Sequence, residues 1–254
     1  MRIIRVRHQG QTFYASLGDG VVINMGREAG VDPIPLGEVG LMPLVVPSKI
    51  IGIGFNFKEQ AESFGIDAPE HPLFFLRPGT SLIGNGRPVL LPPNVRRVYA
   101  EAELALVIGQ TCHRVNRENA GRHIFGYTCA NDLTVADTVN DPFLSTGKSY
   151  NGTCPVGPWL ETQPPDLGEL PIRCLVNGEI RQEGMASEML FTPEEIISYL
   201  SHIMTLNPGD IVLTGSPPGL AEVRPGDSVQ VEIPGVGVLF NAVEGESGSE
   251  LPVQ

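Results

Sequence analysis

The segment 99–109 has the alternating pattern of a buried β-strand, and it carries two acidic residues. Successive side chains of a strand point to opposite faces, so Glu101 and Glu103 are expected on one face and the leucines on the other. A carboxylate beside such an apolar run is costly to bury unless it is paired or bound to a metal. A third acid, Asp132, follows directly after another apolar stretch. The pattern alone leaves two interpretations open: a cation site, or ion pairs with the arginines at 96–97.

Two further patterns predict local structure with a clear physical reason. Asn177-Gly178 between two apolar runs predicts a hairpin over 172–182, because both residues tolerate the positive φ of a type I′ turn. Thr192, followed three positions later by Glu195, is the pattern of a capping box at the start of an amphipathic helix.

The apolar run 50–55 predicts a strand with Gly52 and Gly54 in its interior. Glycine inside a strand is typical of a bulge or of the close approach of another group. A short helix is expected next, over 56–65, with Asn56 as its N-cap residue. On that helix Gln60 would lie on a different face from the apolar side chains.

Composition places the chain among β-rich globular proteins. It has 254 residues with 30 glycines, 23 prolines and few aromatic residues, which favours short strands and turns over a helix bundle. We therefore expect an α+β, β-rich fold, with a small N-terminal β domain over residues 1–46 and a larger domain over 47–254.

Charge and cysteine content exclude several classes of protein. The net charge of −12, without a basic patch, argues against nucleic-acid binding, and no apolar run approaches the length of a membrane span. Four widely spaced cysteines without a Cys-x-x-Cys pair indicate reduced thiols in a cytoplasmic protein.

The three acidic residues also define the kind of cation that would bind. Glu101, Glu103 and Asp132 offer only oxygen ligands, with no cysteine or histidine beside them. Such a ligand set suits a hard cation, Mg²⁺ first and then Mn²⁺ or Ca²⁺.

Several short motifs occur in an order that resembles a known family. They are Gly-Phe-Asn-Phe, Phe-Phe-Leu-Arg-Pro, Glu-Ala-Glu-Leu, Gly-Tyr-Thr-Cys-Ala-Asn-Asp, Gly-Lys-Ser-Tyr, Val-Asn-Gly-Glu, Thr-Leu-Asn-Pro-Gly-Asp and Thr-Gly-Ser-Pro-Pro-Gly. Over about residues 50–243 this set resembles the fumarylacetoacetate hydrolase family. It is most similar to the branch of 2-hydroxyhepta-2,4-diene-1,7-dioate isomerases and 5-oxopent-3-ene-1,2,5-tricarboxylate decarboxylases. The resemblance implies a fold built round a rolled mixed sheet, a homodimer, a divalent metal and a small 2-oxo acid as substrate.

The resemblance also implies roles for individual residues. Glu101, Glu103 and Asp132 match the family's metal carboxylates. The candidate catalytic residues are Lys148, Glu62 and Gln60. The candidate substrate-binding residues are Arg77, Tyr150, Gln182, Thr214 and Gly215; a structural role for Arg77 is equally compatible with the sequence.

The chain departs from the family pattern at the residues that activate water in the hydrolases. In the frame Asn-Tyr-x-x-His-x-x-Glu, Gln60 stands in place of His and Ser63 in place of Glu, and Ala136 replaces an Arg further along. A carboxamide does not accept a proton near neutral pH, and general-base help contributes roughly 10²–10⁴ in rate. Hydrolysis by the usual pair of residues is therefore not expected.

These observations favour a metal-dependent isomerase or decarboxylase of a 2-hydroxydienoate or 2-oxo dicarboxylic acid from aromatic degradation, in which the cation stabilises an enolate. One alternative is an acylpyruvate- or fumarylacetoacetate-type hydrolase of carbon–carbon bonds, with Glu62 as a displaced base. The other is a catalytically silent relative that binds a 2-oxo acid.

Overall fold

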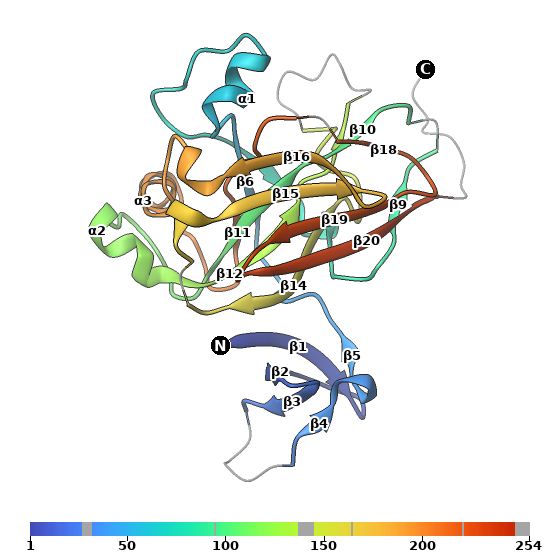
Figure 1. Cartoon of the computed structure of the whole chain (residues 1–254). Coiled ribbons are helices and arrows are strands. Elements are labelled where there is room, and N and C mark those ends of the chain that lie inside the picture. The colour runs from blue at the N-terminus through green and yellow to red at the C-terminus, as the bar shows by residue number, and fades with distance from the viewer. Residues whose placement is uncertain (27–31, 94, 137–144, 164, 220, 247–254) are drawn as a thin grey trace.

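The structure is a computed structural model that describes all residues except 27–31, 94, 137–144, 164, 220 and 247–254. It is rich in strands and has few helices (Figure 1), which confirms the expected α+β class. The helices are α1 (Lys58–Ser63), α2 (Arg117–Ala120) and α3 (Pro193–Ile203), with 3₁₀ turns η1 (Leu36–Glu38), η2 (Gly79–Ser81), η3 (Gly121–His123), η4 (Leu167–Glu169) and η5 (Ala186–Glu188). In this described part, no helix combines the length and the apolar character needed to cross a membrane.

One large mixed sheet runs through the molecule. Its spatial order is β4 (Ile34–Pro35), β3 (Val21–Asn24), β2 (Gln11–Gly18), β1 (Arg2–His8), β14 (Cys154–Glu161), β12 (Ile124–Asn131), β11 (Ala102–Ile108), β17 (Ile211–Leu213), β6 (Ile50–Gly54) and β7 (Leu73–Arg77), with β5 (Gly40–Leu41) beside β1 and β8 (Leu82–Ile83) beside β14. The centre of this sheet brings β11 between β12 and β17, so the acidic segment lies among buried neighbours.

Two smaller sheets complete the architecture. The first has the order β16 (Glu179–Met185), β15 (Pro171–Val176), β19 (Ser228–Ile233), β20 (Gly237–Gly245) and β9 (Val89–Leu91). The second has the order β13 (Thr134–Val135), β10 (Val98–Ala100) and β18 (Ala221–Val223). In Figure 1 the long orange and red strands of the first sheet lie across the green strands β11 and β12.

The N-terminal strands extend the large sheet. Strand β1 pairs with β14 through Arg2 opposite Glu161 and Ile3 opposite Leu160. Strands β1 to β5 lie at one end of the molecule (Figure 1), around a small apolar cluster of their own. The boundary between residues 46 and 47 stays a prediction.

The alternation predicted for the acidic strand is confirmed by its packing. Leu104 and Leu106 belong to the main core, which also contains the apolar face of α3. Ala105 and Val107 belong to a second cluster on the opposite face of the sheet. Glu103 therefore lies on the face of the smaller cluster.

The hairpin and the capping box are also confirmed. Asn177 and Gly178 have φ values of 53° and 82° between β15 and β16. The Thr192 hydroxyl accepts a hydrogen bond from the Glu195 amide, and the Glu195 carboxylate accepts one from the Thr192 amide.

The expected N-cap at Asn56 is wrong. Helix α1 begins at Lys58, and its N-cap residue is Phe57. The buried Asn56 amide instead donates to Thr214 O at 2.7 Å and to Phe191 O at 3.1 Å. These contacts are long-range in sequence, so a local pattern could not reveal them.

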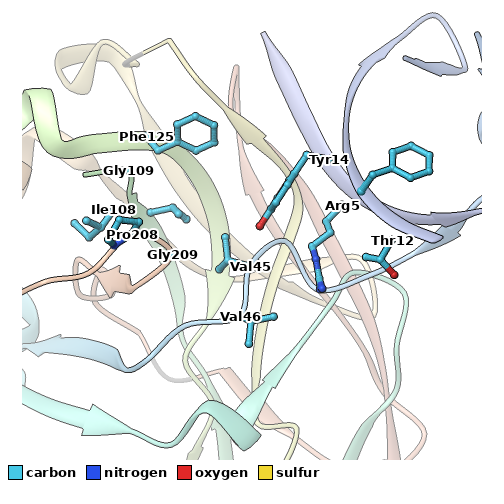
Figure 2. Close-up of a pocket in the computed structure, with 12 residues that line it drawn as sticks. Arg5, Thr12, Tyr14, Val45, Val46, Ile108, Gly109, Phe125, Pro208 and Gly209 are labelled. Atoms are coloured by element: carbon cyan, nitrogen blue, oxygen red, sulfur yellow. The ribbon is translucent and has the colours of Figure 1, made fainter. Parts of the chain in front are cut away.

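A broad cavity of about 560 Å³ lies where the N-terminal strands meet the central sheet (Figure 2). Arg5 and Tyr14 point into it from the N-terminal side, opposite Val45, Ile108 and Phe125. None of the described residues that line it carries a carboxylate, so its chemistry differs from that of the acidic strand.

A buried carboxylate joins β6 to β17, which are parallel neighbours in the large sheet. Asp210 accepts hydrogen bonds from Ser48 N and Oγ at 3.0 and 2.6 Å and from Asn207 N at 2.7 Å, and it pairs with Lys49. Burial alone would raise the pKa of Asp210, but the contacts with Lys49 and Ser48 outweigh it and hold that pKa below its ordinary value.

We predict that Asp210→Asn lowers the free energy of unfolding at pH 7 by about 2 kcal/mol, since charge-assisted hydrogen bonds are lost. Because the folded-state pKa of Asp210 is lowered, its stabilisation is complete above the unfolded-state pKa and is lost as the pH falls through the folded-state value. Urea unfolding should therefore show a wild-type advantage that shrinks in acid. The exposed Asp19→Asn change is the control, and equal stability of the two variants at pH 7 would contradict the prediction.

Candidate active site

Three carboxylates come together beside the central strand. Glu103 belongs to β11, Glu101 lies at the break between β10 and β11, and Asp132 directly follows β12. Pairing of β11 with β12 brings them together, and the Asp132 amide donates to Glu101 O at 2.9 Å. One oxygen of each carboxylate lies within 4.8 Å of the others. The predicted convergence of the three acids is confirmed.

Lys148 is a buried cation that contacts two of these acids. Its Nζ donates to Glu101 Oε1 at 3.0 Å, to Asp132 O at 2.8 Å and to Asp132 Oδ2. An ammonium group has three N–H donors, so these contacts use all of them. Lys148 also lies over the Phe75 ring, with Nζ 5.2 Å from the ring centroid.

Arg77 approaches Asp132 from the other side. It donates to Asp132 Oδ1, to Leu133 O at 3.1 Å and to Thr153 O and Oγ1 at 2.8 and 2.7 Å. Arg77 is buried and is not among the residues that line the cavity beside the acids. Its hydrogen bonds therefore position Asp132 in this structure.

The charges of these groups shift one another's pKa values. Burial, reinforced by the charges of Asp132 and Glu101, raises the pKa of Glu103 well above its usual range. Burial also opposes the charge of Asp132, yet Lys148 and Arg77 keep the pKa of that carboxyl below its ordinary value. Burial would lower the pKa of Lys148, but Asp132 and Glu101 outweigh it and raise that pKa, so the side chain is an ammonium ion at neutral pH.

Thr214, Gly215 and Gln182 form hydrogen bonds with the acidic segment and hold it in place. The Gly215 amide donates to Glu103 Oε2 at 2.6 Å, and Thr214 Oγ1 donates to Leu104 O at 2.9 Å. Gln182 accepts from the Ala102 amide and donates to the loop after β17. Gly215 has a φ of 95°, and a Cβ atom there would lie 2.8 Å from the Asn56 Cβ, so both conformation and space require glycine.

A cavity of about 430 Å³ opens onto the acidic cluster, a size typical of small-molecule sites. Its polar lining includes the three acids, Lys148, Gln60, Ser216, Thr134 and Arg97, and its apolar lining includes Ile53, Phe55, Phe64, Phe75, Tyr99 and Val135. The cavity therefore has an acidic end and a largely aromatic wall, which suits a small ligand with an apolar carbon skeleton.

Two candidate residues lie away from this cavity. The Glu62 side chain is 59% exposed and forms an ion pair with Lys58 at 3.6 Å, because α1 turns it to a different face from Gln60. Tyr150 lines a separate cavity with Thr80 and Arg87. The structure therefore does not bring Glu62 or Tyr150 to the acidic cluster.

Ser216 is a residue that sequence reasoning missed. It is buried, and its hydroxyl donates to Glu101 Oε2 at 3.2 Å and accepts from Gln60 Nε2 at 2.8 Å. Its signal was the Thr-Gly-Ser-Pro-Pro-Gly motif, in which only Thr214 and Gly215 were assigned a role. Thr214 donates to a backbone carbonyl and the Gly215 amide donates to the Glu103 carboxylate, whereas Ser216 lines the cavity.

The acidic cluster has the donor set of a divalent-cation site. Its ligands are oxygens only, which hard cations such as Mg²⁺ prefer. Three oxygens within 4.8 Å of one another can share one cation at the usual metal–oxygen distances of roughly 2.0–2.6 Å. Burial is the main cause of the raised pKa of Glu103, and the charges of Asp132 and Glu101 add to it; a cation would offset both effects.

Comparison with known proteins identifies the family. The family model for the C-terminal part of fumarylacetoacetate (FAA) hydrolase matches residues 49–244, so the chain belongs to the fumarylacetoacetate hydrolase family. A curated relative is the 4-hydroxyphenylacetate degradation bifunctional isomerase/decarboxylase of Salmonella dublin, which is 37% identical over 206 residues. The match covers 79% of this chain and 48% of that relative.

Solved structures with similar folds agree with this assignment. The crystal structure of 5-carboxymethyl-2-hydroxymuconate delta-isomerase from Mycobacterium smegmatis has a TM-score of 0.89 at 35% identity and covers 98% of this chain and 100% of that one. The crystal structure of maleylpyruvate hydrolase from Sphingobium sp. SYK-6, in complex with manganese (II) ion and pyruvate, has a TM-score of 0.81 at 29% identity. The match covers 97% of this chain and 100% of that one. Relatives of this chain are therefore isomerases, decarboxylases and hydrolases.

Gly52 makes room for the aromatic wall of the cavity. A Cβ atom at Gly52 would lie 2.2 Å from the Phe75 ring, whereas at Gly54 it would meet nothing within 4 Å. The expected close approach is thus confirmed at Gly52. Because Phe75 also lies beneath Lys148, the position of this ring affects both the wall and the buried cation.

We predict that Gly52→Ala lowers the free energy of unfolding by about 1–3 kcal/mol, since the Phe75 ring must move. Gly54→Ala is the matched control in the same strand and should be close to neutral. Thermal and urea unfolding measure both, and Phe75→Leu in the Gly52→Ala background should recover part of the loss. Equal effects of the two alanine substitutions would contradict this account.

Proposed function

We propose that this protein is a divalent-metal-dependent isomerase or decarboxylase of a small 2-hydroxydienoate or 2-oxo dicarboxylic acid from aromatic degradation. A compound of the type of 2-hydroxyhepta-2,4-diene-1,7-dioate is the leading candidate substrate. The observation that carries the proposal is the cluster of Glu101, Glu103 and Asp132 at one end of a cavity of small-molecule size. Family relatives with isomerase and decarboxylase names support the same reaction class.

In this proposal the three carboxylates hold the cation, with Mg²⁺ as the first choice and Mn²⁺ or Ca²⁺ as alternatives. A bound divalent cation supplies Lewis-acid stabilisation of the negative charge that develops on a substrate oxygen. Arg77 and Lys148 keep Asp132 ionised and in place, and the Gly215 amide orients Glu103.

The contacts of Lys148, a candidate catalytic residue, do not favour proton transfer by its ammonium group. All three of its N–H donors are engaged, and the neighbouring acids raise its pKa. An ammonium group held in this way is a poor source or acceptor of protons at neutral pH. We therefore assign Lys148 to positioning Glu101 and Asp132.

Hydrolysis fits the residues less well than isomerisation or decarboxylation. Gln60 lines the cavity where the family's hydrolases have a histidine, and a carboxamide does not activate water. Ser63, which replaces the glutamate of that pair, is exposed and donates its hydroxyl to Gln60 O at 2.7 Å. Glu62, the displaced base of the hydrolase alternative, faces away from the cavity.

The proposal is tested by ultraviolet turnover of 2-hydroxyhepta-2,4-diene-1,7-dioate with Mg²⁺ and with a chelator. We expect metal-dependent turnover in the wild type and a loss of at least about 10²-fold in Glu103→Gln, because one ligand and its charge are removed. Glu59→Gln, an exposed position on α1, is the control with the same chemical change and should keep full activity.

Turnover that is indifferent to the chelator would contradict the metal-dependent reaction. Release of a free acid by cleavage of a carbon–carbon bond would instead favour hydrolysis. Binding of a 2-oxo acid without any turnover would favour the silent relative.

A further inference from the structure

A chain of hydrogen bonds connects α1 to the acidic cluster. Gln60 Nε2 donates to Ser216 Oγ at 2.8 Å, and Ser216 Oγ donates to Glu101 Oε2 at 3.2 Å. The three residues come from α1, from the loop after β17 and from the break before β11, and all three line the same cavity.

The direction of these bonds fixes the orientation of the Gln60 amide. An ionised carboxylate only accepts hydrogen bonds, so the single hydrogen of Ser216 must point to Glu101. The Ser216 oxygen is then left as an acceptor, and only the NH₂ group of Gln60 can face it. Exchange of the amide oxygen and nitrogen would place two acceptors against each other. Gln60 Oε1 therefore stays on the side away from Ser216.

This oxygen is buried and has no hydrogen-bond partner among the described residues. A buried acceptor without a donor is unfavourable, so a ligand that brings a donor to this oxygen binds more tightly than one that does not. The carboxylates and the carbonyl of an ionised 2-oxo acid are acceptors only. The enol form of the same acid carries an O–H group.

We propose that Gln60 determines specificity by accepting a hydrogen bond from a substrate hydroxyl, so that the site prefers a 2-hydroxy acid or enol over the corresponding 2-oxo acid. This inference rests on the proposed function for the identity of the substrate class. Ser216 acts as a positioning residue, because its contact with Glu101 holds the amide of Gln60 in the accepting orientation.

The experiment compares two stable ligands that differ at one oxygen. Lactate presents a hydroxyl at C2 and pyruvate presents a carbonyl, and calorimetry with saturating Mg²⁺ measures the affinity of each. We expect the wild type to prefer lactate by roughly tenfold, the equivalent of one satisfied acceptor. Gln60→Met should abolish the preference by weakening lactate alone.

Ser216→Ala is the second variant, and it keeps the test decisive if Gln60→Met fails to fold. Without Ser216 the amide is free to turn its NH₂ group toward the ligand, so the preference should shift toward pyruvate. Gln110→Met, at an exposed position, is the control with the same chemical change and should leave both affinities unchanged.

A wild type without preference, including one to which neither ligand binds, would overturn the proposal, as would a preference that persists in Gln60→Met. These outcomes are distinct from a failure of the proposed function. If only the proposed function fails, 2-hydroxyhepta-2,4-diene-1,7-dioate is not turned over, but the preference for lactate and its loss in Gln60→Met are still measured.

Discussion

The mutual repulsion of three carboxylates in one buried place is the constraint on which the rest of the site depends. One carboxylate oxygen of each of Glu101, Glu103 and Asp132 lies within 4.8 Å of the other two. Two buried cations, Arg77 and Lys148, and backbone and hydroxyl donors stabilise these carboxylates. Burying such a cluster is unfavourable unless its charge is compensated. The shifts in pKa show that the compensation is uneven: it is strong at Asp132, and it leaves Glu103 with a raised pKa. A divalent cation would complete it.

The architecture supports this cluster through residues that make no contact with the cavity. Arg77 and Gln182 are candidate substrate-binding residues, and a structural role for Arg77 was equally compatible with the sequence. In the structure Arg77 donates to Asp132 and to Thr153 O, and Gln182 accepts from the Ala102 amide and donates to Pro217 O. Thr214, which directly follows β17, donates to Leu104 O. Gln60 and Ser216 do line the cavity. Both are neutral polar residues, and a hydrogen bond joins them.

Sequence reasoning succeeded where the physical signal is local or periodic. The alternation along β11, the turn at Asn177-Gly178 and the capping box at Thr192 each depend on neighbours in sequence, and all are confirmed. Ordered motifs identified the family and its acidic cluster. The failures concern side-chain direction. Asn56 and Ser216 take their roles from contacts with distant segments, which a single sequence does not encode in any short pattern. Glu62 is exposed because of its place on the short helix α1, where it pairs with Lys58.

The most direct test of the account is an anomalous difference map from crystals of this protein soaked in Mn²⁺. If the three acids hold a divalent cation, the map will show one peak per chain, roughly 2.0–2.6 Å from an oxygen of each of Glu101, Glu103 and Asp132. A map with no peak there, or with Mn²⁺ bound elsewhere while Lys148 and Arg77 alone neutralise the acids, would contradict it.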